Sequence, residues 1–164
     1  DEKYRNSYFS KFNNIWNHGD WVTHTLNDGI IVHGRSDSTL NRFGVRIGTS
    51  EIYSAIKDLS YVEDSLIIHL DDSNDNKLIL FVKSILEIDH DELKSVIRQK
   101  CSPRHVPDLI FQSHDIPYTI SGKKVEVPIK KILMGKSPND VISKDSLRNP
   151  KSLDWFVEFY KNYL

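Results

Sequence analysis

Hydrophobic and polar positions alternate in short blocks along this chain, and several blocks predict β-strands. The β-prone runs are Val22–Leu26, Ile30–His33, Tyr61–Leu70, Lys77–Ser84 and Asp108–Gln112. Asn27-Asp28-Gly29 separates the first two runs and predicts a hairpin, because Asp-Gly suits a tight turn between strands. The polar letters DDSNDN separate the next two and predict an antiparallel pair.

Other blocks carry apolar residues at helical spacing and predict four helices. Their apolar faces are Ile52, Ile56 and Leu59; Leu93, Val96, Ile97 and Cys101; Ile129, Ile132 and Leu133; and Leu153, Phe156, Val157, Tyr160 and Leu164. Thr49 or Ser50 is expected to cap the first helix, and Asp89 the second, with Glu92 in the capping-box position. The order predicts an α+β fold: a small antiparallel sheet of about three strands, plus a separate two-stranded hairpin, flanked by helices.

Composition restricts the class of protein. With 164 residues the chain can form one domain, or one with an appendage. The net charge of −1, from 22 basic and 23 acidic residues, argues against a nucleic-acid binder. Cys101 stands alone, which excludes an internal disulfide and favours a reducing compartment. The longest apolar run, Leu78–Val82, is too short to span a bilayer, and no signal peptide precedes it, so we expect a cytoplasmic protein.

The stretch from Gly34 to Glu51, GRSDSTLNRFGVRIGTSE, combines three arginines with three glycines. Glycines among cations suit a backbone that approaches an anion closely, which suggests a phosphate-handling loop. A solvated hairpin with charged tips explains the same composition. The seven histidines form no His-x-x-x-His pair and there is one cysteine, so no metal site is predicted.

Two further positions carry candidate chemistry. Lys123, next to Gly122 in a polar loop, could reach a phosphate or carboxylate as a point charge, or could lie on a plain surface turn. Asp20 could accept hydrogen bonds from ligand hydroxyls or simply form a turn. No nucleophile-elbow, Walker or dinucleotide glycine pattern occurs.

Three motifs together resemble a known family. Gly34-Arg35-Ser36-Asp37, followed by Asn41, Gly44, Arg46 and Glu51-Ile52, is similar to the hinge-and-loop motif of the adenylate-forming enzymes. The stretch 117–123, PYTISGK, resembles the C-terminal lysine motif of that family, and Gly19-Asp20 resembles the motif near the end of its large N-terminal domain. The phrases HGDW, SPRHVPD and SLDWFVEF extend the resemblance, which is strongest to the branch of acyl-CoA synthetases that activates acetoacetate.

The resemblance implies a piece of a larger enzyme. Residues 1–36 would be the end of the large N-terminal domain with a hairpin leading to the hinge, residues 37–135 the mobile C-terminal lid, and residues 136–164 an extension with an amphipathic helix. That helix would either cap the lid's own core or dock elsewhere. The expected partners are the large N-terminal domain of the same chain and small-molecule substrates, with no nucleic acid and no membrane.

The implied reaction is an ATP-dependent acid–CoA ligation. Mg-ATP and an acid would give an acyl-adenylate, and coenzyme A would then form the thioester, with the lid in a different orientation for each step. ATP with Mg and coenzyme A are implied as substrates of the full-length enzyme; the fragment alone is expected to bind neither tightly and to be inactive. A ligase for another short acyl acid, or a stand-alone nucleotide- or coenzyme A-binding module, are the alternatives.

The resemblance also assigns roles residue by residue. Lys123 would hold the acid and the α-phosphate in the first step, Gly44 would line the pantetheine tunnel in the second, and Asp37 would be the hinge. The remaining matches are Asp20 for the ribose hydroxyls, Arg35 and Arg46 for the AMP phosphate and nucleotide region, and Arg98 for a phosphate of coenzyme A.

Overall fold

A three-stranded sheet forms the centre of the protein in the computed structural model, which describes residues 2–36, 40–42, 44–72 and 75–163. Its strands are β5 (Asp64–Asp72), β6 (Asp75–Lys83) and β7 (Leu109–Ser113), in the order β5-β6-β7. The predicted antiparallel pairing of β5 with β6 is confirmed.

The prediction of a wholly antiparallel sheet is wrong at β7, which runs parallel to β6. Helix α3 (His90–Lys100) follows β6, and the 3₁₀ turn η1 (Pro103–His105) precedes β7. Together they carry the chain back across the sheet, and parallel neighbours require such a crossover. Strand propensity alone does not indicate the direction in which β7 runs.

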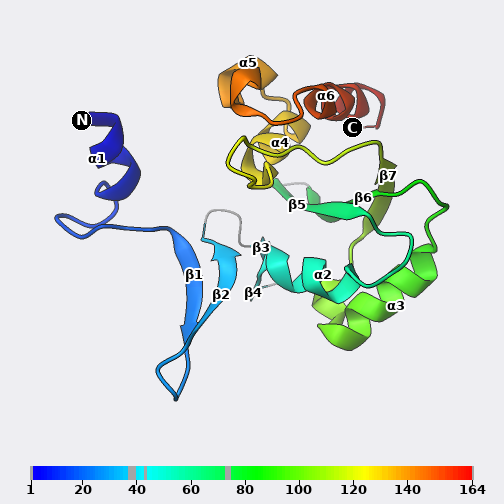
Figure 1. The fold of residues 1–164 in the computed structure, drawn as a ribbon, viewed down its shortest axis with the longest axis horizontal. Coiled ribbons are helices and arrows are strands. Elements are labelled where there is room, and N and C mark those ends of the chain that lie inside the picture. Colours follow the sequence, from blue (N-terminus) through cyan, green and yellow to red (C-terminus); the bar gives the residue numbers. More distant parts are fainter. Residues whose placement is uncertain (1, 37–39, 43, 73–74, 164) are drawn as a thin grey trace.

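Helices cover both faces of the sheet (Figure 1). Helices α2 (Thr49–Ile56) and α3 pack on one face, whereas α4 (Glu126–Leu133) and α6 (Lys151–Tyr163) pack on the other. The short helix α5 (Pro138–Val141) and the turn η2 (Lys144–Ser146) lie in the stretch 135–149, whose polar composition predicts a linker.

The central strand β6 explains the longest apolar run of the sequence. Leu78 and Leu80 belong to the core under α2 and α3, whereas Ile79 and Phe81 belong to the core under α4 and α6. Successive side chains of a strand point to opposite faces, so a strand buried on both faces needs apolar residues without alternation.

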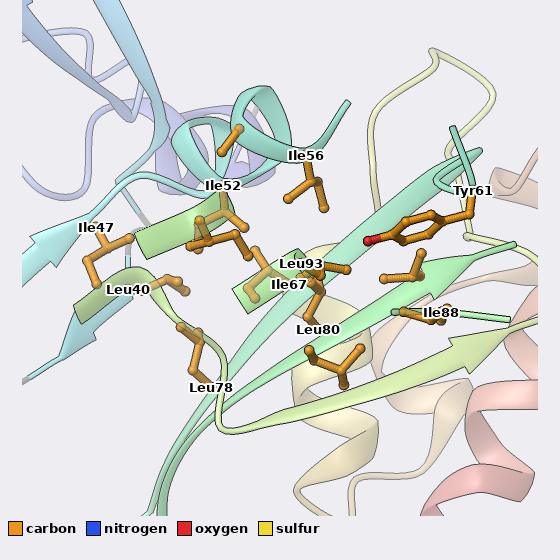
Figure 2. Packing of buried hydrophobic residues seen from close by; sticks show 14 residues of the cluster. Leu40, Ile47, Ile52, Ile56, Tyr61, Ile67, Leu78, Leu80, Ile88 and Leu93 are labelled. Atoms are coloured by element: carbon orange, nitrogen blue, oxygen red, sulfur yellow. The ribbon is translucent and has the colours of Figure 1, made fainter. Parts of the chain in front are cut away.

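The core under α2 and α3 includes residues from a hairpin that the sequence analysis did not predict. Strands β3 (Leu40–Arg42) and β4 (Val45–Ile47) pair in an antiparallel arrangement within the Arg- and Gly-rich stretch. Leu40 and Ile47 each place an aliphatic side chain in the buried cluster with Ile52 and Leu78, as Figure 2 shows. Each strand of the hairpin is therefore anchored to the main domain.

Of the two predicted helix caps, the structure confirms one and contradicts the other. The Asp89 carboxylate accepts hydrogen bonds from the N–H groups of Asp91 (3.1 Å) and Glu92 (2.9 Å), so the predicted cap of α3 is confirmed. The cap predicted for α2 is wrong, because α2 begins after Gly48 with no side-chain cap. The Ser50 hydroxyl instead donates to the carbonyl of His33 (2.6 Å).

Gly48 allows this close approach of α2 to the preceding hairpin. A β-carbon at position 48 would lie 2.6 Å from the carbonyl oxygen of His33, so only glycine fits there without a shift of the backbone. The hairpin is formed by β1 (Asp20–His24) and β2 (Ile30–Arg35), which pair in an antiparallel arrangement as predicted.

The N-terminal part also contains α1 (Glu2–Tyr8), which the apolar pattern did not predict. Most apolar side chains of the β1–β2 hairpin are exposed, among them Val22, Ile31 and Val32. Within the described ranges, no helix is long and apolar enough to cross a membrane.

The terminal helix α6 packs on the sheet of its own domain. The ring centroid of Phe81 on β6 lies 5.0 Å from that of Phe156 and 5.1 Å from that of Phe159. Phe156 is fully buried. Of the two positions considered for this helix, it therefore occupies the one over its own core.

We expect Phe156→Ala to lower the free energy of unfolding of the 164-residue chain by roughly 3–5 kcal/mol, because it leaves a cavity among aromatic rings packed edge to face. Urea denaturation followed by circular dichroism measures the change. Glu158→Ala, at an exposed position of the same helix, is the control and should cost less than about 0.5 kcal/mol. Equal stability of the two variants would contradict the packing described here.

Candidate functional site

A cleft of about 480 Å³ lies between the N-terminal segment, α2 and the loop before α4. It brings together side chains that are far apart in the sequence: Tyr8, Trp16, His18, Asp20, Val32, Thr49, Ser50, Tyr53, Lys123, Lys124 and Glu126. Two of the residues predicted from motifs, Asp20 and Lys123, therefore line one cleft.

Asp20 is the first residue of β1, and its carboxylate contacts Nδ1 of His18. Lys123 is exposed, and its ammonium group makes no hydrogen bond or ion pair with any residue that the structure describes. A carboxylate acceptor and an available cation in one cleft suit a ligand that carries both hydroxyl and anionic groups.

A tight turn presents Lys123. The N–H of Gly122 donates to the carbonyl of Thr119 (2.9 Å), and the N–H of Thr119 donates to the carbonyl of Lys123 (2.9 Å). The Thr119 hydroxyl accepts from the N–H of Lys123 at 3.0 Å. Gly122 has φ +80°, a left-handed conformation that glycine adopts without strain. The loop backbone is thus held by its own hydrogen bonds, whereas the lysine side chain is exposed.

By contrast, internal contacts hold the side chain of the adjacent Lys124 in place. Its ammonium donates to Oδ1 of Asp64 (2.7 Å) and to the carbonyl of Ser65, and lies 4.0 Å from the ring centroid of Tyr53. Neither composition nor propensity distinguishes two neighbouring lysines. The structure separates them, because one is committed to internal contacts and the other is not.

Lys124 and Tyr53 bond to two backbone groups on the free edge of β5, the carbonyl of Ser65 and the N–H of Ile67. This strand lies at the edge of the sheet, so backbone groups that point away from β6 need other partners. The Tyr53 hydroxyl accepts from the N–H of Ile67 (3.1 Å) and donates to Oε1 of Glu126 (2.7 Å). The wall of the cleft behind Lys123 therefore contains a hydrogen-bonded polar network.

Two tyrosines in this network titrate above their ordinary range. Burial, together with the nearby Glu126 carboxylate, raises the pKa of Tyr53 well above its usual value. Burial and the hydrogen bond from its hydroxyl to Asp64 raise the pKa of Tyr118. Both hydroxyls consequently remain protonated donors at neutral pH, which suits a structural role and not proton transfer.

We expect Lys124→Met to lower the free energy of unfolding by about 3 kcal/mol, since it leaves the half-buried Asp64 carboxylate without its counter-charge. Lys123→Met, one residue away, should change stability by less than about 0.5 kcal/mol. Urea denaturation of both variants tests the difference. Equal losses would show that the two lysines are not divided between structure and ligand as described.

Gly44 and Arg98 are not among the described residues that line this cleft. Gly44 is in the β3–β4 turn with φ +77°, and a β-carbon there would meet no atom of the described residues within 4 Å, its chain neighbours aside. Arg98 is exposed on α3. Arg35 ends β2. Asp37, the predicted hinge, lies outside the residues that the structure describes.

Arg46 on β4 lies next to the cleft without lining it. Its guanidinium stacks over the Trp21 ring, 4.5 Å from the ring centroid, and Trp21 directly follows Asp20. This contact joins the β3–β4 hairpin to the β1–β2 hairpin through a cation–π interaction. Arg46 is exposed, so its remaining donors can still reach a ligand.

Arg42 has a structural position that the sequence analysis missed. It is buried, and its guanidinium donates to the carbonyl of Val106 (2.6 Å) and pairs with Asp108. The Asp108 carboxylate also accepts from the N–H of Leu78 (2.7 Å). Arg42 therefore fixes the hairpin that carries Gly44, and it is not one of the cations available to a phosphate. Its sequence context gave no sign of this burial.

No group of three or more His, Cys, Asp or Glu residues that could hold a metal ion occurs in the described ranges 2–36, 40–42, 44–72 and 75–163. The described residues that line the cleft include lysines, carboxylates and aromatic side chains.

Comparisons with known proteins agree with one another. The chain is 43% identical over 166 residues to an acetoacetyl-CoA synthetase of Caenorhabditis elegans, a match that covers 96% of this chain and 23% of that protein. It is 43% identical over 160 residues to the acetoacetyl-coenzyme A synthetase of Rhizobium meliloti (strain 1021), covering 94% and 24% respectively. Among solved structures, an acetoacetyl-CoA synthetase from Streptomyces lividans matches with a TM-score of 0.92 at 36% identity, over 99% of this chain and 25% of that chain.

More distant likeness extends only to the fold. An amide bond synthetase from Marinactinospora thermotolerans matches with a TM-score of 0.63 at 16% identity, over 71% of this chain and 24% of that chain. No family model matches. The chain spans about a quarter of the length of the curated relatives that it matches. Its small sheets flanked by helices match the C-terminal domain of adenylate-forming enzymes.

Proposed function

We propose that this chain is the C-terminal lid of an acetoacetate–CoA ligase. Nearly its whole length is similar to acetoacetyl-CoA synthetases, and it spans about a quarter of the length of those proteins. Three segments belong to this proposal. Residues 1–36 end the large N-terminal domain, residues 37–135 form the lid, and residues 136–164 form its extension. A cytoplasmic location is also proposed, and the lone Cys101, which leaves these 164 residues without an internal disulfide, fits a reducing compartment.

The proposed reaction has two steps. A carboxylate oxygen of acetoacetate attacks the α-phosphorus of Mg-ATP, which gives acetoacetyl-AMP and releases pyrophosphate. The thiol of coenzyme A then attacks the acyl carbon, loses its proton and displaces AMP. The lid presents a different face in each step, and Asp37 is the hinge between the two orientations.

The observation that carries the proposal is the shared cleft of Lys123 and Asp20. An exposed ammonium without an internal partner can hold the acid and the α-phosphate together while negative charge develops in the transition state. Asp20 can accept hydrogen bonds from the ribose hydroxyls of the same nucleotide. The shared cleft therefore supports a lid orientation in which Lys123 serves the first step.

The second step uses residues outside the cleft. Gly44, at the exposed β3–β4 turn, would line the channel for the pantetheine arm, and Arg98 would meet a phosphate of coenzyme A. Arg46, next to Asp20 through Trp21, would contact the AMP phosphate region, as would Arg35 at the end of β2. The free space at the β-carbon position of Gly44, among the residues that the structure describes, supports this assignment, because a substrate could approach there.

Acid-dependent ATP–pyrophosphate exchange by the full-length protein tests the function. We expect exchange with acetoacetate to exceed exchange with acetate by at least about 10-fold, a difference of 1.4 kcal/mol in transition-state binding. A preference for another short acid would retain the ligase and overturn its substrate. The absence of exchange with every short acid would overturn the ligase itself.

A further inference from the structure

The chain between α5 and α6 runs directly beside the loop that carries Lys123. Thr119 and Leu147 form an antiparallel bridge. The N–H of Ile120 donates to the carbonyl of Ser146 (2.9 Å), and the N–H of Arg148 donates to the carbonyl of Tyr118 (2.9 Å). The extension therefore pairs with three consecutive residues on the N-terminal side of the lysine loop.

Asn149 forms the tightest part of this contact. Its amide nitrogen donates to Oδ2 of Asp115 (2.6 Å) and to the carbonyl of Ile116 (2.7 Å), while its amide oxygen accepts from the N–H of Tyr118 (2.9 Å). Both amide donors and the amide oxygen are thus used within four residues of chain. The side chain binds the base of the lysine loop at three points.

Asn149 is also the joint to the terminal helix. Its backbone carbonyl accepts from the hydroxyl (2.6 Å) and the N–H (3.0 Å) of Ser152 in the first turn of α6. Helix α6 is anchored in turn by Leu153 and Phe156 in the core beneath it. A rigid path therefore leads from that core through Asn149 to the backbone of the lysine loop.

On the opposite side, Asp115 connects this joint to the sheet. Its carboxylate also pairs with Nζ of Lys83 on β6 (3.1 Å). Burial alone would raise the pKa of Asp115, but the hydrogen bonds from Asn149 and Lys83 outweigh it and hold the pKa below its usual value. The Asp115 carboxylate thus stays charged and accepts from both neighbours.

We propose that Asn149 is a positioning residue for the first half-reaction, which it serves by fixing the backbone from which Lys123 extends. This inference rests on the proposed function. Lys123 has a long side chain whose ammonium makes no hydrogen bond or ion pair with a described residue, so its placement depends on the loop backbone. A displacement of about 1 Å at such a group can cost on the order of 10²-fold in rate.

The test uses the full-length enzyme with Asn149→Ala. We expect acetoacetate-dependent ATP–pyrophosphate exchange to lose between about 10-fold and 100-fold in kcat. Thioester formation from supplied acyl-adenylate should change less than about twofold, because Lys123 has no role in that step. A general loss of structure could not separate the two half-reactions in this way.

The matched control is Leu93→Ala, which removes buried contacts from α3 in the core on the other face of the sheet, away from α6 and Asn149. It should lower the melting temperature at least as much as Asn149→Ala and leave both half-reactions within about twofold of wild type when assayed below that temperature. A fall of both half-reactions together in Asn149→Ala would assign Asn149 a structural role and overturn the inference.

The two proposals fail separately. If the wild-type enzyme shows no acid-dependent exchange, the ligase proposal is wrong and the role of Asn149 falls with it. If wild type exchanges and Asn149→Ala retains exchange within twofold, the ligase stands and the positioning role is refuted. In a Lys123→Ala background, Asn149→Ala should cost less than about twofold, because it acts through that lysine; a full additive loss would contradict this.

Discussion

Lys123→Ala is expected to lower acid-dependent ATP–pyrophosphate exchange by the full-length enzyme on the order of 10²–10³-fold, roughly 3–4 kcal/mol, the usual effect of removing a positioned donor. The ammonium makes no contact with the described part of the chain, so the change removes a ligand contact and leaves the fold intact. Thioester formation from supplied acyl-adenylate should therefore remain close to wild type.

Lys131→Ala is the control for lost surface charge, because Lys131 is exposed on α4, the helix that follows the lysine loop. It should retain both half-reactions. Equal loss of exchange and thioester formation in Lys123→Ala would remove the assignment of this lysine to the first step. Lys124 cannot serve as a control, since its contacts with Asp64 and Ser65 make it part of the fold.

Gly44→Leu should have the opposite effect: exchange is retained, while thioester formation falls roughly 10²-fold because the side chain blocks the approach of the thiol. The structure makes this variant informative. A β-carbon at position 44 meets no atom of the described residues within 4 Å, its chain neighbours aside, so the start of a side chain has room on the lid itself. An obstruction would have to arise with the substrate or with the large domain.

Gly44→Ala separates volume from backbone strain. Both substitutions place a side chain on a residue with φ +77°, which costs an L-residue about 1–2 kcal/mol whatever its size. Only leucine adds substantial volume at the turn. Steady-state kinetics with coenzyme A would compare the two, and normal coenzyme A turnover in Gly44→Leu would refute the tunnel assignment.

The parts of the fold that were predicted correctly depend on sequence signals that act over a few residues. Asp28-Gly29 between β-prone runs identified the β1–β2 hairpin, and Asp89 identified the start of α3, because each signal acts over a few residues. The direction of β7 depends on where the crossover returns the chain, which no local pattern encodes. Strands β3 and β4 are too short, at 3 residues each, to show an alternating pattern.

Motif resemblance singled out Asp20 and Lys123, which line one cleft in the structure, and their roles there stay predictions. It could not indicate which of the remaining polar residues support them. Arg42 and Lys124 look like solvent-exposed cations in the sequence, yet each is held by internal acceptors. Asn149 lies in a stretch predicted as a polar linker, and its role emerges only when the extension pairs with the lysine loop.

The edge of β5 has a consequence for the proposed rotation of the lid. A strand with unpaired backbone groups can recruit a second molecule by β-pairing, and such exposed edges are sites of aggregation. Here Lys124 and Tyr53 bond to two of these groups, the carbonyl of Ser65 and the N–H of Ile67, from within the domain. In the proposed cycle, this part of the edge therefore keeps its partners whichever position the lid occupies on the large domain.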